Sequence, residues 1–164
     1  MGSAGSRPGS RTIGEAIDGR RATRGGTMRA ETELIGPGDQ VRRVMHVVVA
    51  TVAEECSARE VAEELVADEV GAVLVTGPHG PVGIVSERDV VTALVTGGDL
   101  DRLQAADLMT TDILWADPND GIGEVARRMQ EARVRHVPVR GDSGAVAGIV
   151  SVRDVLECLA GPLG

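Results

Sequence analysis

The sequence has almost no aromatic residues and no lysine. Trp115 is the only aromatic side chain, so a buried core has to be built from Val, Leu, Ile and Ala, and all 17 basic residues are arginine. The net charge is −8, although residues 1–30 hold six Arg against only Glu15 and Asp18. The rest of the chain is therefore strongly acidic, which argues against a large nucleic-acid interface, since that needs a basic face.

Cysteine is scarce, and long apolar runs are missing. Cys56 and Cys158 match no metal or redox spacing, and two lone cysteines fit a reducing compartment. No apolar run approaches the ~18 residues of a membrane span, and the N-terminus lacks the apolar segment of a secretion signal. We therefore expect a cytoplasmic protein without a membrane partner.

The residue patterns of common catalytic sites are missing as well. His46, His79 and His136 share no metal-ligand spacing with one another or with the cysteines. No Walker loop is present, and no nucleophile is paired with a base. We expect no enzymatic activity, no metal site and no required cofactor. The sequence predicts no catalytic, channel or DNA-binding domain. We therefore expect the folded part of this chain to stand alone or to act on a partner protein in trans.

What the sequence does contain is a repeated element. It reads Gly-Ile-Val-Ser-Glu-Arg-Asp at 83–89 and Gly-Ile-Val-Ser-Val-Arg-Asp at 148–154, so six of the seven positions agree. In each copy apolar residues end a predicted strand, and a Ser opens a run with helical spacing. Ser-x-x-Asp at this place is typical of a capping box, in which the serine and the acid bond to the first turn.

The surrounding sequence repeats at an offset of 64 to 65 residues. Each copy predicts the order strand, helix, strand, strand and helix. In the first copy, the leading strand and the segment that leads into it (the lead-in) span 44–52, and the next helix begins at the capping box of Ser57 and Glu60. The fold class is α/β (α+β by some schemes), with two βαββα repeats packed around a pseudo-twofold axis, because one such repeat cannot bury both its faces. The predicted parts are a disordered arm at 1–38, repeat 1 at 41–98, a connector at 99–106 and repeat 2 at 107–160.

With both copies laid out, residues 41–160 closely resemble a tandem pair of CBS domains, the unit called a Bateman module. The matching residues are the repeated element, the Asp-Leu-Met-Thr lead-in at 107–110 and the Arg-His-Val-Pro-Val strand at 135–139. The resemblance implies a pair of three-stranded sheets flanked by helices, with two related clefts between the copies. Such clefts bind adenosine nucleotides, and sometimes S-adenosylmethionine or an NAD-type ligand, and many modules form flat dimers.

The residues themselves suit an adenosine nucleotide. A carboxylate accepts hydrogen bonds from the vicinal ribose hydroxyls, a helix start with a serine binds phosphate, and an apolar strand makes a slot for adenine. The candidate ligand residues of these three kinds are Ser86, Asp89, Ser151, Asp154, Val49, Ala50, Ile113 and Leu114.

The two copies differ beside the strand that follows the first helix. The second has Arg135 and His136 there, where family members that bind phosphorylated ligands often place basic residues, and the first has Gly71 and Ala72. We expect unequal sites, with Asp89 as the partner of Arg135, because family clefts draw on both repeats. The alternative is that Arg135 and His136 form a solvated edge. Trp115 either stacks on a base or fills the core.

Three functions remain open. The first is a regulatory sensor that binds an AMP-, ADP- or ATP-like nucleotide and signals through the geometry of a homodimer, which the helix at 87–97 favours because it is apolar on several faces. The second is a ligand-free dimer that acts by protein contact, its Ser-x-x-Asp elements serving only as caps. The third gives the function to the basic arm, as a segment that contacts RNA or an acidic partner.

Overall fold

The computed structural model describes residues 35–160, and these residues form two units that do not follow the two sequence repeats. One unit consists of residues 48–113, and the other combines residues 35–47 with residues 114–160. The arm expected at 1–38 lies outside the described residues except for its last four. Of these, Gly36 donates its N–H to Asp39 (2.8 Å), and the carbonyl of Pro37 accepts from the N–H of Gly123 (2.8 Å).

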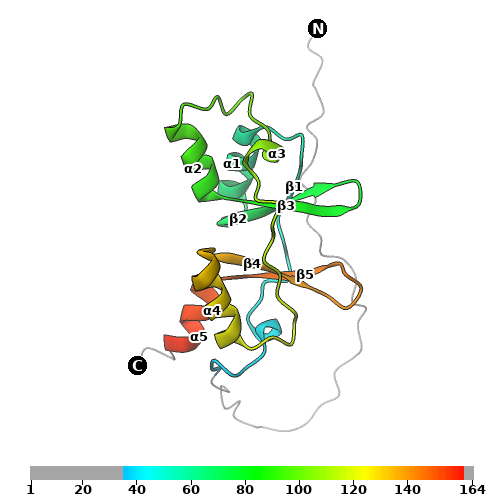
Figure 1. The fold of residues 1–164 in the computed structure, drawn as a ribbon, viewed down its shortest axis with the longest axis vertical. Coiled ribbons are helices and arrows are strands. Elements are labelled where there is room, and N and C mark those ends of the chain that lie inside the picture. The colour runs from blue at the N-terminus through cyan, green and yellow to red at the C-terminus, as the bar shows by residue number, and fades with distance from the viewer. Residues whose placement is uncertain (1–34, 161–164) are drawn as a thin grey trace, which may run out of the picture. The chain divides into compact units, whose positions relative to one another are not determined.

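The first unit is a three-stranded sheet covered by helices (Figure 1). Its strands, in spatial order, are β1 (Thr51–Ala53), β2 (Ala72–Gly77) and β3 (Gly80–Ser86), and β1 runs parallel to β2 while β3 runs antiparallel. Its helices are α1 (Ala58–Ala67), α2 (Glu87–Val95) and α3 (Ala105–Leu108). The structure confirms the capping box of α1, since Ser57 and Glu60 exchange both bonds (3.2 and 2.8 Å).

Valine, leucine and alanine form the buried core of this unit. Val73 and Val75 of β2 and Val85 of β3 are fully buried, and Val61 and Leu65 of α1 pack against them. The last two lie four residues apart and therefore share one face of the helix. The N-terminal half of β2 is buried along its whole length, as expected for a central strand between two neighbours.

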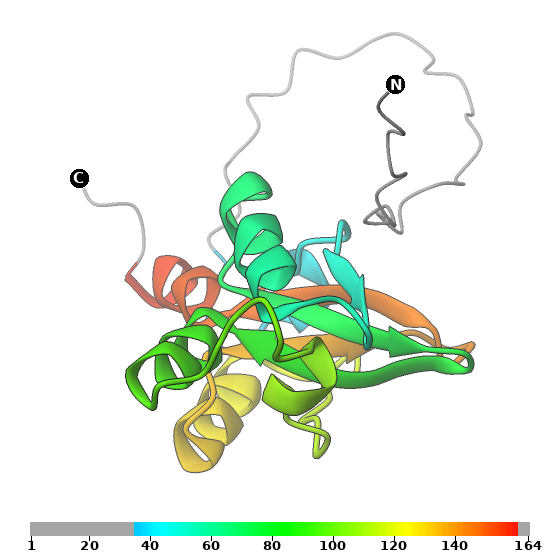
Figure 2. The ribbon, with the colours of Figure 1, turned by 90° about the horizontal axis from the view of Figure 1, so that it is seen from above.

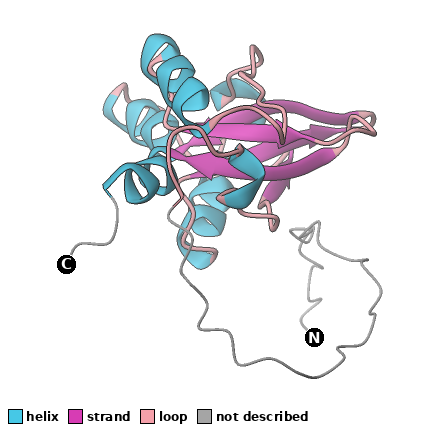
Figure 3. Ribbon diagram, turned by 90° about the horizontal axis from the view of Figure 1, so that it is seen from below, coloured by secondary structure: helices cyan, strands magenta, loops and turns pink. Residues whose placement is uncertain are grey.

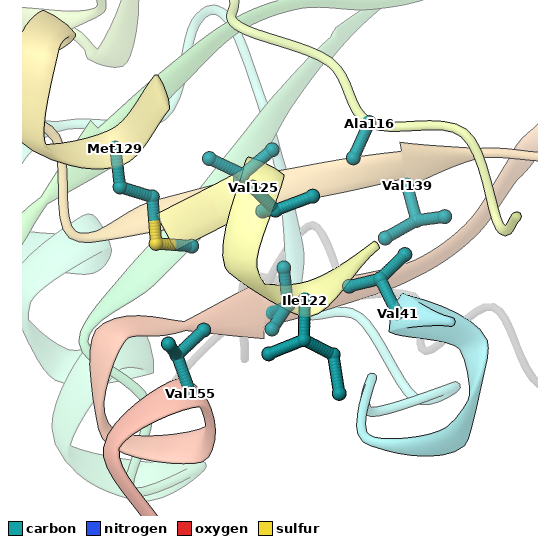
Figure 4. Close-up of a cluster of buried hydrophobic side chains, with 9 residues drawn as sticks. Val41, Ala116, Ile122, Val125, Met129, Val139 and Val155 are labelled. Carbon is teal, nitrogen blue, oxygen red and sulfur yellow. The ribbon is translucent and has the colours of Figure 1, made fainter. Parts of the chain in front are cut away.

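The second unit has a smaller sheet. It contains η1 (Val41–Arg43), α4 (Ile122–Ala132), β4 (His136–Arg140), β5 (Val146–Ser151) and α5 (Val152–Ala160), with β4 and β5 paired as an antiparallel hairpin. Its core is a cluster of aliphatic residues with Met129 at one end (Figure 4). Val41 of η1, fully buried, lies in this cluster with Ile122 and Val139, so the start of the first repeat completes the core of the second.

The predicted leading strand of the second repeat is reduced to one bridge, which corrects the expectation of two three-stranded sheets. Of the residues predicted to form this leading strand, only Ala116 pairs with β4, opposite Val139. In the first unit the N–H of Leu74 donates to the carbonyl of Ala50 (3.0 Å) and ties β1 to β2. Pro138 stands at the equivalent place and has no N–H to donate, so the second ladder is interrupted there. The first leading strand has three residues and lies at the end of the run 44–52, which was predicted as a strand with its lead-in.

Each repeat begins with a short lead-in segment, which contains His46 in repeat 1 and Thr110 in repeat 2. Each lead-in lies in the unit that holds the rest of the other repeat, so the lead-ins are exchanged. Thr110, in repeat 2, pairs with Ile84 of β3 (2.9 and 3.1 Å), and His46, in repeat 1, pairs with Ile149 of β5 (2.8 and 2.9 Å). The segment of Thr110 also contains α3, which begins inside the stretch predicted as a connector. Each repeated element is therefore completed by the lead-in of the other repeat.

The glycine that opens each repeated element allows this close approach. A Cβ on Gly83 would lie 2.5 Å from Sδ of Met109, and one on Gly148 would lie 2.6 Å from the carbonyl oxygen of His46. Neither distance is possible between real atoms, so a side chain at either position displaces the lead-in. Figures 2 and 3 show that the hairpin turns and the helix starts lie at opposite ends of the strands, so the lead-ins contact the elements close to the helix starts.

Gly148→Ala should destabilise the protein more than Gly83→Ala. The contact at Gly148 is a backbone oxygen, which is fixed by its own hydrogen bonds, whereas the contacts at Gly83 belong to the side chain of Met109. We expect a loss of about 1–3 kcal/mol in the free energy of unfolding for Gly148→Ala, measured by urea titration. Equal losses for the two variants would contradict the assignment of the fixed contact.

Candidate ligand site

The first repeated element places Ser86 at the junction of β3 and α2. Its N–H and its hydroxyl both donate to Oδ2 of Asp89, at 2.7 and 2.6 Å. The N–H of Glu87 donates to the carbonyl of Gly71 at 3.1 Å, which ties the helix start to the beginning of β2. The capping interpretation of Ser-x-x-Asp is therefore confirmed for this copy.

The second element repeats this geometry at α5. The N–H and the hydroxyl of Ser151 donate to Oδ2 of Asp154, both at 2.7 Å, and the N–H of Asp154 reaches the serine oxygen at 3.3 Å. The N–H of Val152 donates to the carbonyl of Arg135 at 2.8 Å. In both copies the cap occupies one carboxylate oxygen, Oδ2, and the fold uses one amide of the first turn.

This pattern limits what the serines can bind. A hydroxyl has a single hydrogen, and in both elements that hydrogen already points to the aspartate. While the cap is intact, Ser86 and Ser151 can accept a hydrogen bond from a ligand, but they cannot donate one to phosphate. A phosphate at either helix start would depend on the remaining amides of the first turn and on nearby basic side chains.

The two aspartates differ in their second oxygen. Oδ1 of Asp154 lies 3.0 Å from Nε2 of His46, a ring that is 67% exposed, while the Asp154 side chain is 12% exposed. Within residues 35–160 no partner lies at hydrogen-bond distance from Oδ1 of Asp89. Thr110 takes the place of His46 in that unit, because it forms the same backbone bridge to the element.

His46 is the residue of this arrangement that the sequence reasoning missed. The repeat aligns Met45 and His46 with Met109 and Thr110, so the position itself was visible in the sequence. The pairing with Asp154 joins residues that lie 108 positions apart and belong to different repeats. Only the exchange of lead-ins brings them together.

The basic pair Arg135 and His136 lies beside the second element. The carbonyl of Arg135 accepts from the first turn of α5, and His136 opens β4 directly opposite Ser151. Arg135 is exposed and His136 is half-buried. Within its own unit the pair is therefore next to Ser151 and Asp154, whereas its expected partnership with Asp89 involves both units and stays a prediction.

The candidate adenine residues are less uniform than expected. Val49 and Ala50 are buried, and Ala50 also bonds through its carbonyl to β2. Ile113 and Leu114 are half-buried, and Leu114 packs against the core of the second unit. Their role in binding a base stays a prediction.

Two arginines contact Trp115, one at its ring and one at its backbone. The guanidinium of Arg140 lies 4.4 Å from the centre of the indole ring, which is the geometry of a cation–π contact. Arg128 donates to the carbonyl of Trp115 and forms an ion pair with Asp120 at 2.8 Å. Arg140 therefore covers one face of the ring, and a base could stack only on the other.

The ionisation of Asp154 follows from its contacts. Burial raises the pKa of its carboxyl, but the bonds from the hydroxyl and N–H of Ser151 and from His46 outweigh burial and hold the pKa below its usual value.

Burial raises the pKa of the thiols of Cys56 and Cys158, which keeps both protonated and unreactive at neutral pH. Among residues 35–160 no three His, Cys, Asp or Glu side chains gather as a metal site would require. No helix within this range has the length and apolar character needed to cross a membrane.

Asp154→Asn should lower the melting temperature at pH 6 and much less near pH 3. Because the folded pKa lies below the unfolded value of ~3.9, the ionised carboxylate stabilises the fold above that value, and this contribution disappears as the pH falls through the folded pKa. Thermal unfolding of both proteins across this range measures the difference, with Asp142→Asn in the exposed hairpin turn as a charge-matched control. A deficit that stays constant down to pH 3 would contradict the prediction.

Several solved structures share the fold of this chain. The chain is 29% identical to a CBS domain protein of Pyrobaculum aerophilum whose structure was solved in complex with AMP, with a TM-score of 0.65 over 70% of this chain and 88% of that one. It is 25% identical to the CBS domain pair of protein MJ0100, crystallised with 5-methylthioadenosine and S-adenosyl-L-methionine, with a TM-score of 0.66 over 73% and 94%. A hexameric CBS-CP12 protein from bloom-forming cyanobacteria is also 25% identical, with a TM-score of 0.67 over 72% and 66%.

The match to the family extends over most of the chain. The chain spans 62%, 45% and 32% of the lengths of three curated relatives that it matches, all named as uncharacterised proteins. The model of the CBS domain family matches residues 41–96 and again residues 105–161. The two repeats and the mixed helices and strands agree with this match: the chain belongs to the CBS domain family and carries a pair of these domains.

Proposed function

We propose that this CBS pair binds an adenosine nucleotide at its Ser-x-x-Asp elements and acts as a regulatory module without catalytic activity. The observation that carries the proposal is the geometry of the two aspartates: the cap uses only Oδ2, so Oδ1 remains as an acceptor for a ribose hydroxyl. Two structures similar to this chain hold AMP or S-adenosylmethionine, ligands that share an adenosine group.

The two elements are proposed to bind unequally. Asp89 has its second oxygen open within the described part of the chain, whereas that of Asp154 is paired with His46. The basic residues Arg135 and His136 favour a phosphorylated ligand over an uncharged adenosyl compound. The first candidate ligand is therefore AMP, ADP or ATP, ahead of S-adenosylmethionine or NAD.

Homodimerisation is proposed from two equivalent apolar faces. Val91, Leu94 and Val95 of α2 are exposed, and so are the residues that answer them on α5, Leu156 and Leu159. Large apolar side chains that recur at matching places of two helices are typical of a surface that a partner covers. Since the two faces are alike, a second copy of the chain is the partner that fits both. A change in the packing of this interface is how nucleotide occupancy would reach a protein partner.

The surroundings of the protein are proposed to be the cytoplasm. Cys56 and Cys158 are free thiols, and they belong to different units. Unpaired cysteines of this kind fit a reducing compartment. The alternative that gives the function to the basic arm concerns residues outside those described.

The two aspartates should respond differently to substitution by asparagine. Asparagine keeps a capping oxygen but offers no charge, and a charge-assisted bond in a partly buried site is worth about 1.5–3 kcal/mol, or roughly ten- to a hundredfold in affinity. We expect Asp89→Asn to weaken AMP binding at least about tenfold and Asp154→Asn to change it little, as measured by titration calorimetry at pH 5.5. Small and equal losses, or no AMP binding by the wild type, would support the ligand-free dimer instead.

Leu94→Glu should dissociate the homodimer. A carboxylate in the centre of an apolar interface loses its hydration without gaining a partner, which costs far more than the interface gains there. Sedimentation velocity at micromolar concentration should show a dimer for the wild type and a monomer for the variant. Pro78→Glu adds the same charge to an exposed hairpin turn and serves as the control. A wild type that sediments only as a monomer would overturn the proposal.

A further inference from the structure

We infer that His46 controls whether Asp154 is available to a ligand, so that the second element is a proton-dependent nucleotide site and the first is not. This inference rests on the proposed function and concerns the regulation of the same site. It follows from a difference between two places that the repeat otherwise makes equivalent. In one unit a histidine of the lead-in contacts the aspartate, and in the other a threonine takes its place.

The position of His46 is fixed by its backbone. Its N–H donates to the carbonyl of Ile149 (2.8 Å), and its carbonyl accepts from the N–H of the same residue (2.9 Å). The contact of Gly148 with Met45 and with the carbonyl of His46 holds this segment against β5. The imidazole is therefore carried to Oδ1 of Asp154 by a rigid part of the fold, while most of its ring surface stays in solvent.

The carboxylate cannot serve His46 and a ribose in the same way. Oδ2 of Asp154 already accepts both bonds of Ser151, so a ribose hydroxyl has to use Oδ1. That oxygen is 3.0 Å from Nε2 of His46. A carboxylate oxygen has two lone-pair sites, and His46 takes one of those on Oδ1, so a diol that donates both of its hydroxyls to Oδ1 has to displace or weaken the histidine contact.

The cost of this displacement depends on pH. A charge-assisted bond from an imidazolium is roughly twice as strong as one from a neutral donor, and histidine ordinarily gains its proton between about pH 5 and 8. Lower pH therefore strengthens the hold of His46 on Asp154 and weakens the binding of the diol. Threonine does not titrate, so the Asp89 element lacks this dependence.

The elements that carry this pair, and those bonded to them, also carry other charged groups. They are Asp39 and Arg43 of the segment before and in η1, Arg135 and His136 at the start of β4, and Arg153 and Glu157 of α5. Arg43 is paired with Asp39, and the carboxylates of Asp39, Asp154 and Glu157 all act on the thiol of Cys158. His136 is the histidine among these groups, and a proton gained there would act with the opposite sign, because a positive charge attracts a phosphate. The test therefore needs His136 to be removed.

The chain supplies matched variants for the test. His46→Thr copies the residue that the other lead-in carries, and Thr110→His introduces the histidine at the first element. Both are made in the His136→Gln background of the full chain, and AMP binding is measured by titration calorimetry at pH 5.5, 6.5 and 8. With His136→Gln alone, we expect weak binding at the second element at pH 5.5 that strengthens about tenfold by pH 8. His46→Thr should make that site equally strong at all three values, and Thr110→His should make the first site pH-dependent.

Two outcomes overturn the inference, and they are distinguishable. If AMP binds but its pH profile is the same with and without His46, the histidine has only a structural role and the proposed function stands. If no variant binds AMP at any pH, the proposed function fails, and this inference fails with it. A fall in melting temperature for His46→Thr without a change in the pH profile belongs to the first outcome.

Discussion

The close approach of a lead-in segment to the glycine of each repeated element is the contact on which this structure depends. At Gly83 and at Gly148 there is no space for a single carbon atom, because a methionine side chain and, at the second site, a backbone oxygen lie against the strand. That approach forms the backbone bridges to Ile84 and Ile149. It therefore fixes which side chain stands beside each aspartate, and the difference between histidine and threonine there makes two equivalent elements chemically unequal.

The sequence predicted the parts of the fold that depend on interactions between residues close together in the chain. The capping boxes of Ser57 and of the Ser-x-x-Asp elements need only residues three positions apart, and the helices follow them as expected. The interruption of the second leading strand could also be predicted from the sequence, because Pro138 has no N–H to donate to the neighbouring strand. The repeat comparison aligned Pro138 with Leu74, but the consequence appears only when the bond from Leu74 to Ala50 is seen.

The candidate site was predictable in its residues and not in its pairings. Asp154, Ser151 and His136 were identified from the repeat and from charge, and the structure brings these three together in one unit. His46 had no signal of its own, because its partner is in the other repeat and a lone histidine matches no motif. Whether Arg135 serves the same ligand as Asp89 depends on tertiary arrangement, which periodicity and spacing do not encode.

The exchange of lead-ins also sets the order in which the protein can be completed during synthesis. The bond between His46 and Asp154 closes a loop of 108 residues, and Val41 enters a core whose other members begin at Ala116. The described part of the first unit is contiguous in sequence, so all of it is available once residue 113 has been made. The first segment of the second unit has no packing partner until α5 has been made. Long loops of this kind slow folding, because the entropy of loop closure is lost before new contacts compensate for it. A ribosome that pauses after the first unit would thus leave the apolar side of residues 41–47 exposed.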